Sequence, residues 1–196
     1  MIRFVLASAS PARLATLRAA GLDPEVIVSG VDESAVVAAD TATLATRLAF
    51  AKASAVACTR PDALVLGCDS LLDVDASIVG KPASIEDAVA HWKAMRGRTA
   101  VLYTGHALVY GDRVLSEVAG TTVHFADPDD AEIAAYVGTG EPLAVAGSFT
   151  VDGLGGWFVD AVDGDHHNVV GVSLPVLRRM VRRLGLSLAD LGWPGR

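Results

Sequence analysis

The stretch 63–82, with the sequence ALVLGCDSLLDVDASIVGKP, constrains the fold more than any other part of this chain. Its first residues, 63–67, form an apolar run with the length and β-branched content of a buried strand. We predict that this strand ends at Gly67 and that Asp69 follows at the mouth of a sheet. In open α/β sheets, ligands bind in the crevice outside the carboxyl ends of strands. Asp69 is therefore the first candidate for a reacting group.

Lysine is rare in this chain, and Lys52 and Lys81 are two of only three lysines among 16 basic residues. Lys81 lies in the tight turn GKP, a setting that favours a ligand-binding role, although a hairpin with a solvated lysine explains the same residues. Lys52 lies on a helix predicted over 41–59, close to the face that should pack. It either extends along that face to solvent or reaches a ligand.

The N-terminal segment predicts a short strand over 3–7 followed by a helix. Ser10 is placed to cap this helix and Pro11 to occupy its first position. A serine-rich turn at a helix N-terminus offers hydroxyls and free amide N–H groups, which suit a phosphate. Arg13 lies in the first helical turn, where the helix dipole disfavours a cation, and this favours an anion site over an ordinary cap.

Two further segments carry clustered acidic residues. Asp32 and Glu33 follow a strand predicted over 24–29, and paired carboxylates at a strand end can hold Mg²⁺, although a solvated loop explains them equally. The segment 141–175 is rich in glycine and aspartate, and its glycines permit close backbone approach around Asp152. We expect the second half of a site in this segment.

The rest of the chain alternates further helices and strands without an internal repeat or a low-complexity linker. We predict helices over 84–96, from 127 to about 137 and from 174 onward, and two β runs within 99–126 around a turn at 111–112. With 196 residues and 52% hydrophobic composition, the chain can bury a core as one domain or as two closely joined lobes.

The composition argues against several classes of function. The formal net charge of −7 disfavours a non-specific binder of nucleic-acid polymers. A small anionic substrate is compatible with this charge if a local basic cluster and a divalent cation offset the protein's own field. No run reaches the ~18 apolar residues of a membrane span, and the first segment is too short for a signal peptide, so we expect no membrane partner and a cytoplasmic location.

Cysteine and histidine show no metal-binding pattern. Cys58 and Cys68 lack the CxxC spacing, so we predict neither a disulfide nor a zinc site and expect both thiols to be reduced and buried. His106 falls in a predicted strand without ligand spacing and is expected to be structural. The adjacent His166 and His167 cannot both face one metal ion from a strand.

Several motifs, in order along almost the whole chain, resemble the Maf family of nucleoside triphosphate pyrophosphatases. The matching pieces are LASASPAR (6–13), VDE (31–33), AKA (51–53), GCDS (67–70), GKP (80–82), YTGHALV (103–109), TGEPL (139–143), AGSFTVDGLGG (146–156) and GDHHNVVGVSLP (164–175). The resemblance implies an α/β fold over 1–196, with a mixed twisted sheet flanked by helices and two closely joined lobes around an active-site cleft. It also implies hydrolysis of a nucleoside triphosphate to the monophosphate and pyrophosphate with a divalent cation, Mg²⁺ or Mn²⁺.

By matching position, the resemblance implies catalytic roles for four residues. Asp69 would accept a proton, and Lys52 and Lys81 would neutralise phosphate charge. Glu33 would help with metal or water, which makes Glu33 and Asp69 the implied metal ligands. These roles agree with the residue types, because preplaced cations stabilise charge on phosphate oxygens and a carboxylate can take the proton from the water that attacks the α-phosphorus.

The resemblance also implies substrate contacts. Ser8 and Arg13 would hold the triphosphate. At three substrate-selecting positions this chain has Ala12, Ser70 and Asp152, whereas the branch acting on dTTP and UTP carries Arg, Thr and Gln, and the branch acting on 7-methyl-GTP carries Trp, Gln and Glu. A carboxylate could accept from the N1–H and N2–H of guanine, but Ala12 offers no aromatic face to a methylated base. Base preference, the choice between canonical and modified nucleotides, and oligomeric state, a homodimer included, stay open.

Two other functions compete at this point. The segment 73–77, DVDAS, resembles the DxDx[T/V] motif of haloacid-dehalogenase-type phosphatases, but it lies in a predicted hairpin rather than at the end of the first strand of a doubly wound sheet. The second is a nucleotide-sensing regulator of cell division or stress that binds without turnover. The product separates them, because such a phosphatase releases orthophosphate, the regulator releases nothing, and a pyrophosphatase releases pyrophosphate.

Overall fold

The computed structural model describes residues 1–194 and contains a mixed sheet of seven strands. The strands are β1 (Phe4–Leu6), β2 (Glu25–Val26), β3 (Leu64–Val74), β4 (Ser77–Val79), β5 (Thr99–Tyr110), β6 (Arg113–Phe125) and β7 (Val159–Asp163). Their order is β2-β1-β3-β5-β6-β7, and β4 pairs with β3 beside this path. β1 runs parallel to β2 and β3, whereas β3, β5, β6 and β7 pair antiparallel in turn, as expected for a mixed α/β sheet.

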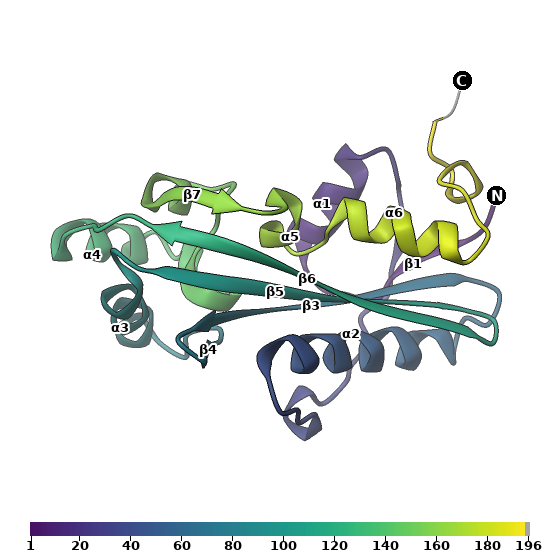
Figure 1. The fold of residues 1–196 in the computed structure, drawn as a ribbon, viewed down its shortest axis with the longest axis horizontal. Coiled ribbons are helices and arrows are strands. Elements are labelled where there is room, and N and C mark those ends of the chain that lie inside the picture. The colour runs from purple at the N-terminus through teal and green to yellow at the C-terminus, as the bar shows by residue number, and fades with distance from the viewer. Residues whose placement is uncertain (195–196) are drawn as a thin grey trace.

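Helices cover both faces of this sheet. They are α1 (Pro11–Ala19), α2 (Thr41–Ala57), α3 (Ile85–Met95), α4 (Asp130–Gly138), α5 (His166–Val170) and α6 (Leu174–Arg183), with short 3₁₀ turns η1 (Glu33–Ala35), η2 (Glu141–Ala144), η3 (Ala146–Ser148), η4 (Leu154–Phe158) and η5 (Ala189–Leu191). α2 lies on one face, α1, α5 and α6 lie on the other, and α3 and α4 gather at one end (Figure 1). Within residues 1–194, none of the helices combines the length and the apolar character of a membrane span.

The predicted strands and helices are largely confirmed, but the strand expected to end at Gly67 is wrong in its length. β3 continues through Asp69 to Val74, because β5 pairs with it from Val65 to Asp73 and supplies hydrogen-bond partners along its whole course. The strand expected over 24–29 is reduced to the two residues of β2. Cys58 also differs from expectation, because it follows the last turn of α2 and is exposed.

An opening interrupts one edge of β3. β1 pairs with the first part of this strand as far as Leu66, and β4 pairs with its last part from Leu72 onward. Among residues 1–194, no strand pairs with 67–71 of β3 along this edge. The chain leaving β1 and the chain leaving β4 both reach the opening. The crevice expected beside Asp69 therefore lies where β1 ends, not where β3 ends.

Two glycines allow α2 to lie directly on the sheet. A Cβ added to Gly67 of β3 would lie 2.2 Å from the carbonyl oxygen of Ala49 and 2.7 Å from the nitrogen of Ala53. A Cβ added to Gly105 of β5 would lie 2.2 Å from the carbonyl oxygen of Ala45. These distances are far below van der Waals contact, so only glycine permits this approach. The small residues on the facing side of α2 complete the fit.

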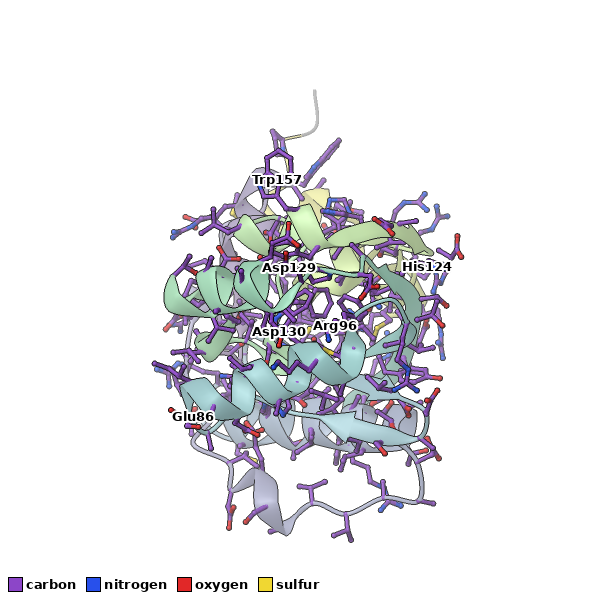
Figure 2. All side chains as sticks on the ribbon, turned by 90° about the vertical axis from the view of Figure 1, so that its left-hand side faces the viewer. Glu86, Arg96, His124, Asp129, Asp130 and Trp157 are labelled. Carbon is purple, nitrogen blue, oxygen red and sulfur yellow. The ribbon has the colours of Figure 1, made fainter. Side chains whose placement is uncertain are left out.

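A cluster of aromatic rings packs the end of the sheet near α3 and α4. Trp92 of α3 is fully buried, and its ring meets Phe125, Tyr136 and Phe158 edge-on at centroid distances of 5.4–5.7 Å. Figure 2 views the molecule from this end, with α3 and α4 in front. Trp157, which is 85% exposed, projects at the top of that view.

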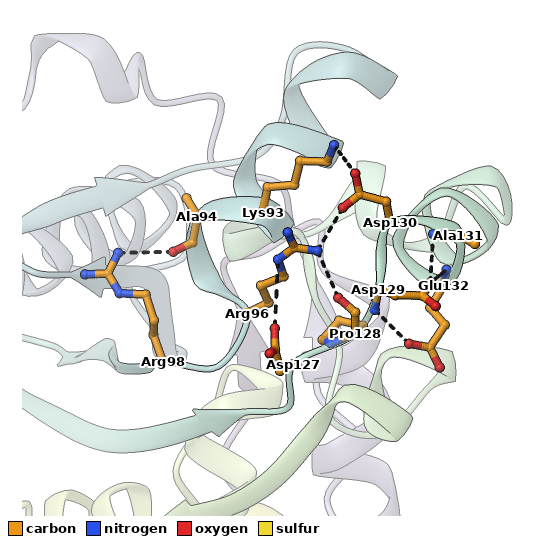
Figure 3. Close-up of polar contacts among 10 residues, drawn as sticks. All are labelled: Lys93, Ala94, Arg96, Arg98, Asp127, Pro128, Asp129, Asp130, Ala131 and Glu132. Carbon is orange, nitrogen blue, oxygen red and sulfur yellow. Dashed lines mark hydrogen bonds and ion pairs between the residues drawn. The ribbon is translucent and has the colours of Figure 1, made fainter.

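Ion pairs join the C-terminal end of α3 to the start of α4 (Figure 3). Asp130 accepts hydrogen bonds from Lys93 at 2.7 Å and from Arg96 at 2.8 Å, and these two contacts lower its pKa. Asp129 and Glu132 form a capping box, which confirms the predicted helix start. Because these charged groups are exposed, they contribute little to stability, and the buried rings carry most of the packing.

We expect Gly67→Ala to destabilise the fold by about 1–3 kcal/mol or more, because the added methyl group must push α2 away from the sheet. Gly138→Ala is the matched control, since a Cβ there meets no atom within 4 Å and the φ of Gly138 is not left-handed. Urea unfolding followed by circular dichroism measures both variants. Equal stability of the two would contradict the close packing of α2.

Candidate active site

Three charged residues meet beside the opening in β3. Lys52 projects from α2 and its Nζ donates to Oδ1 of Asp69 and lies 2.8 Å from Oε1 of Glu33, the first residue of η1. Asp69 faces α2 because it lies two residues after Gly67, and alternate residues of a strand share a face. Both Lys52 and Asp69 are buried, whereas Glu33 is half exposed. The possibility that Lys52 merely extends to solvent is thereby excluded.

The environment of Asp69 favours its protonated form. Burial disfavours the carboxylate and raises its pKa above the usual value, and the nearby Glu33 charge acts in the same direction. The Lys52 ammonium, which also donates a hydrogen bond, and the Arg13 guanidinium oppose this effect but do not cancel it. Asp69 is therefore a stronger base than an ordinary aspartate.

Arg13 organises a second cluster on the opposite face of the sheet. Its Nε donates to the carbonyl of Gly171 at 2.8 Å, and its two terminal nitrogens donate to Oγ of Ser8 at 3.1 Å and Oγ of Ser70 at 3.0 Å. Gly171 has a φ of +123°, and a Cβ there would lie 3.0 Å from Nε of Arg13. The buried guanidinium thus uses three of its five N–H groups on the protein itself and keeps two for a ligand.

These contacts determine whether each serine hydroxyl can donate a hydrogen bond to a ligand or only accept one. Ser8 Oγ accepts from the backbone N–H of Ser10 and from Arg13, so its own hydrogen is free to donate. Ser70 Oγ lies 2.9 Å from Oγ1 of Thr104, which donates to the carbonyl of Asn168. The hydrogen of Ser70 therefore points to Thr104. Ser8 can donate to an anion, whereas Ser70 offers a ligand only an acceptor.

A groove beside α1 brings together residues that are distant in the sequence. Ala12 of α1 and Asp152, from the loop before η4, line it together with His166 and His167. Its volume is about 470 Å³. Ala12 precedes Arg13, so this groove begins next to the guanidinium cluster. The glycine-rich segment expected to hold the second half of a site thus contributes Asp152 to this groove.

Lys81 lies apart from these clusters in the loop that follows β4. It is exposed, and within residues 1–194 no ion pair or hydrogen bond of its side chain is recorded. The loop is anchored next to it, because the carbonyl of Gly80 accepts from the backbone N–H of Gly147 at 3.1 Å. β4 borders the opening in β3. The loop that follows β4 therefore brings Lys81 toward the edge of the sheet where Asp69 lies.

Two residues of the site lie within the matching motifs, but nothing in the sequence indicates what they contact. Thr104, in YTGHALV, is fully buried in β5 and orients Ser70, and the carbonyl of Gly171, in GDHHNVVGVSLP, accepts a hydrogen bond from Arg13. His166 and His167 begin α5 rather than continue a strand. In the part of the chain that the structure describes, no three His, Cys, Asp or Glu side chains are grouped to hold a metal ion.

Comparison with known proteins identifies the family. A family model described as "Maf-like protein" matches residues 3–184. A "Nucleoside triphosphate pyrophosphatase" of Streptomyces coelicolor is 56% identical over 98% of this chain and 95% of its own length, and one of Streptomyces avermitilis is 55% identical over the same shares. One of Rhodococcus jostii is 51% identical over 97% of this chain and 96% of its own. The chain therefore belongs to the Maf-like protein family.

Proposed function

We propose that this chain is a nucleoside triphosphate pyrophosphatase, which uses one water molecule to release pyrophosphate and leave a nucleoside monophosphate. The buried contact of Lys52 with Asp69 and Glu33 carries the proposal, because it places a carboxylate with a raised pKa and a cation together at an open edge of the sheet. The names of the similar proteins from Streptomyces coelicolor and Streptomyces avermitilis support it.

The residues at the β3 opening divide the work of phosphate binding and proton transfer. Ser8 donates its free hydroxyl hydrogen to the triphosphate, and the two unused N–H groups of Arg13 face the same anion. Lys52 and Lys81 neutralise negative charge that spreads over the phosphate oxygens in the transition state. Asp69 takes a proton from the water that attacks the α-phosphorus from the side opposite the leaving pyrophosphate.

Glu33 and Asp69 are the residues that would hold a divalent cation. Mg²⁺ prefers oxygen ligands and commonly binds through one or two carboxylates together with substrate phosphates, so two carboxylates suffice. Lys52 contacts Oδ1 of Asp69 and Oε1 of Glu33, which leaves the second oxygen of each side chain available. When bound, Mg²⁺ or Mn²⁺ supplies positive charge that stabilises the phosphate oxygens and the leaving group.

The groove beside α1 is the proposed binding site of the nucleobase. Asp152 presents a carboxylate that accepts hydrogen bonds, and Ala12 leaves room on the helix side. Of the other two selecting positions that the resemblance implies, Ala12 has no hydrogen-bonding side chain, and Ser70 gives its hydrogen to Thr104 and keeps only an acceptor. Selection among bases therefore depends mainly on Asp152.

We expect Asp69→Asn to lower pyrophosphate release by at least about 100-fold while nucleotide binding is kept, because the amide cannot accept the proton. Asp73→Asn is the matched control on the same strand. Asp73 accepts from Thr41 Oγ1 at 2.5 Å and from the N–H of Ala76 at 2.8 Å, as a turn residue does. An assay with malachite green, run with and without added pyrophosphatase, measures both products.

The outcome of that pair of variants also tests the rival functions. Loss of turnover in Asp73→Asn with orthophosphate as the first product would favour the haloacid-dehalogenase-type phosphatase. Binding without turnover in the unaltered protein, with Mg²⁺ or Mn²⁺ present, would favour the regulator. Equal turnover by Asp69→Asn would remove Asp69 from its catalytic role.

The raised pKa of Asp69 predicts an acid limb in the pH profile. The base acts only when ionised, so kcat/KM should fall as the pH decreases toward a midpoint above the ordinary aspartate value of 3.8. Lys52→Gln removes the cation that opposes this rise, so its residual activity should have a midpoint at higher pH. Single-turnover pyrophosphate release with enzyme in excess measures both profiles. Superimposable acid limbs would show that Asp69 is not the titrating group.

Asp152→Gln should change the base profile of the enzyme. A carboxylate only accepts hydrogen bonds, whereas an amide both donates and accepts, so the preference should move away from bases that donate two hydrogen bonds. The kcat/KM values for a panel of nucleoside triphosphates measure this change. An unchanged profile would show that Asp152 does not read the base.

A further inference from the structure

The carboxylate of Glu141 accepts four hydrogen bonds outside the catalytic clusters. Oε1 accepts from Oη of Tyr136 at 3.0 Å, from Oγ1 of Thr150 at 2.5 Å and from the backbone N–H of Gly155 at 2.9 Å, and Oε2 accepts from the backbone N–H of Leu154 at 2.9 Å. A carboxylate has about four acceptor sites, so the protein itself uses most of the acceptor capacity of Glu141.

Three of the four donors lie at the ends of the segment 150–155, which leads from η3 into the start of η4. Two glycines lie where this segment packs closely on the side chains of Glu141 and Tyr136. A Cβ on Gly153 would lie 2.6 Å from Oε2 of Glu141, and one on Gly155 would lie 2.4 Å from Oη of Tyr136. Within residues 1–194 no strand pairs with this segment; Val151 packs against the core, and the Glu141 carboxylate binds both ends of the segment.

Asp152 lies at the centre of this anchored segment. Its side chain lines the groove that Ala12 and His166 also line, while it is itself exposed. Thr150 on one side of Asp152 and Leu154 on the other are both bound to Glu141. The position of the Asp152 carboxylate in the groove therefore depends on Glu141, which does not itself line the groove.

We propose that Glu141 is a positioning residue that holds Asp152 at the groove through the backbone of 150–155 and thereby sets the enzyme's preference among nucleobases. This inference rests on the proposed function, in which the groove seats the base. All four partners donate to Glu141, and two of them are backbone N–H groups that cannot accept a hydrogen bond. A glutamine can place its oxygen where Oε1 lies, but its NH₂ group then faces the N–H of Leu154, a donor that it cannot satisfy.

A double-mutant cycle tests this role. We expect Glu141→Gln to raise KM for the best nucleotide about tenfold and to flatten the base profile, with kcat within about twofold. In an Asp152→Asn background the same change should alter KM by less than about twofold, because the group that Glu141 positions is already impaired. Steady-state pyrophosphate release over a panel of nucleoside triphosphates supplies KM and kcat for all four proteins.

Glu132→Gln is the matched control for loss of a hydrogen-bonded carboxylate. Glu132 closes the capping box of α4 and does not line the groove, so its substitution should lower Tm and leave KM and the base profile unchanged. Thr150→Val removes a single donor to Glu141 and gives a milder variant with the same expected direction. It replaces Glu141→Gln in the cycle if that protein does not fold.

The outcomes separate this inference from the proposed function. If the unaltered enzyme releases no pyrophosphate from any nucleotide, both are overturned. If it turns over and the Glu141 or Thr150 variant changes KM equally with and without the Asp152 change, Glu141 is only structural and the inference alone is overturned. A variant that folds and keeps the original KM and base profile overturns it as well.

Discussion

The close approach of α2 to the sheet is the constraint on which the site depends. Gly67 and Gly105 lie on neighbouring strands and leave no room for a Cβ between the sheet and the helix backbone. Lys52 precedes Ala53, which packs against Gly67, and its ammonium reaches Asp69 two residues beyond Gly67. A sheet with larger residues at these positions would keep its strands but lose the buried contact between cation and carboxylate.

The opening in β3 explains how one strand serves two clusters. Asp69 and Ser70 are adjacent, so their side chains point to opposite faces, toward α2 and toward Arg13 respectively. Where a strand is paired along both edges, its neighbouring strands separate the side chains on one face of the sheet from those on the other. Where neither β1 nor β4 covers β3, the Asp69 cluster and the Arg13 cluster border the same uncovered edge. The mixed pairing of β3 is thus a condition for the proposed chemistry and not a detail of topology.

Polar residues away from the reacting atoms define the geometry of this site. Arg13, expected to hold phosphate, also orients Ser8 and Ser70, and Thr104 receives the hydrogen of Ser70. Glu141 likewise accepts hydrogen bonds from the loop that carries Asp152. Such contacts stabilise one arrangement of hydroxyls and carboxylates before the substrate arrives, which limits the reorganisation needed in the transition state.

The sequence by itself determined the helices other than α5, the β5–β6 hairpin and the Ser10 cap, because local periodicity and capping residues carry that information, and its ordered motifs indicated the candidate catalytic residues. Tertiary structure decided where β3 ends, since pairing with β5 extends it past Gly67, and left Cys58 exposed. It also decided that Lys52 contacts Asp69 and that Glu141 anchors the Asp152 loop. These contacts join segments distant in the chain, and no local pattern encodes the direction of a hydrogen bond formed only after packing.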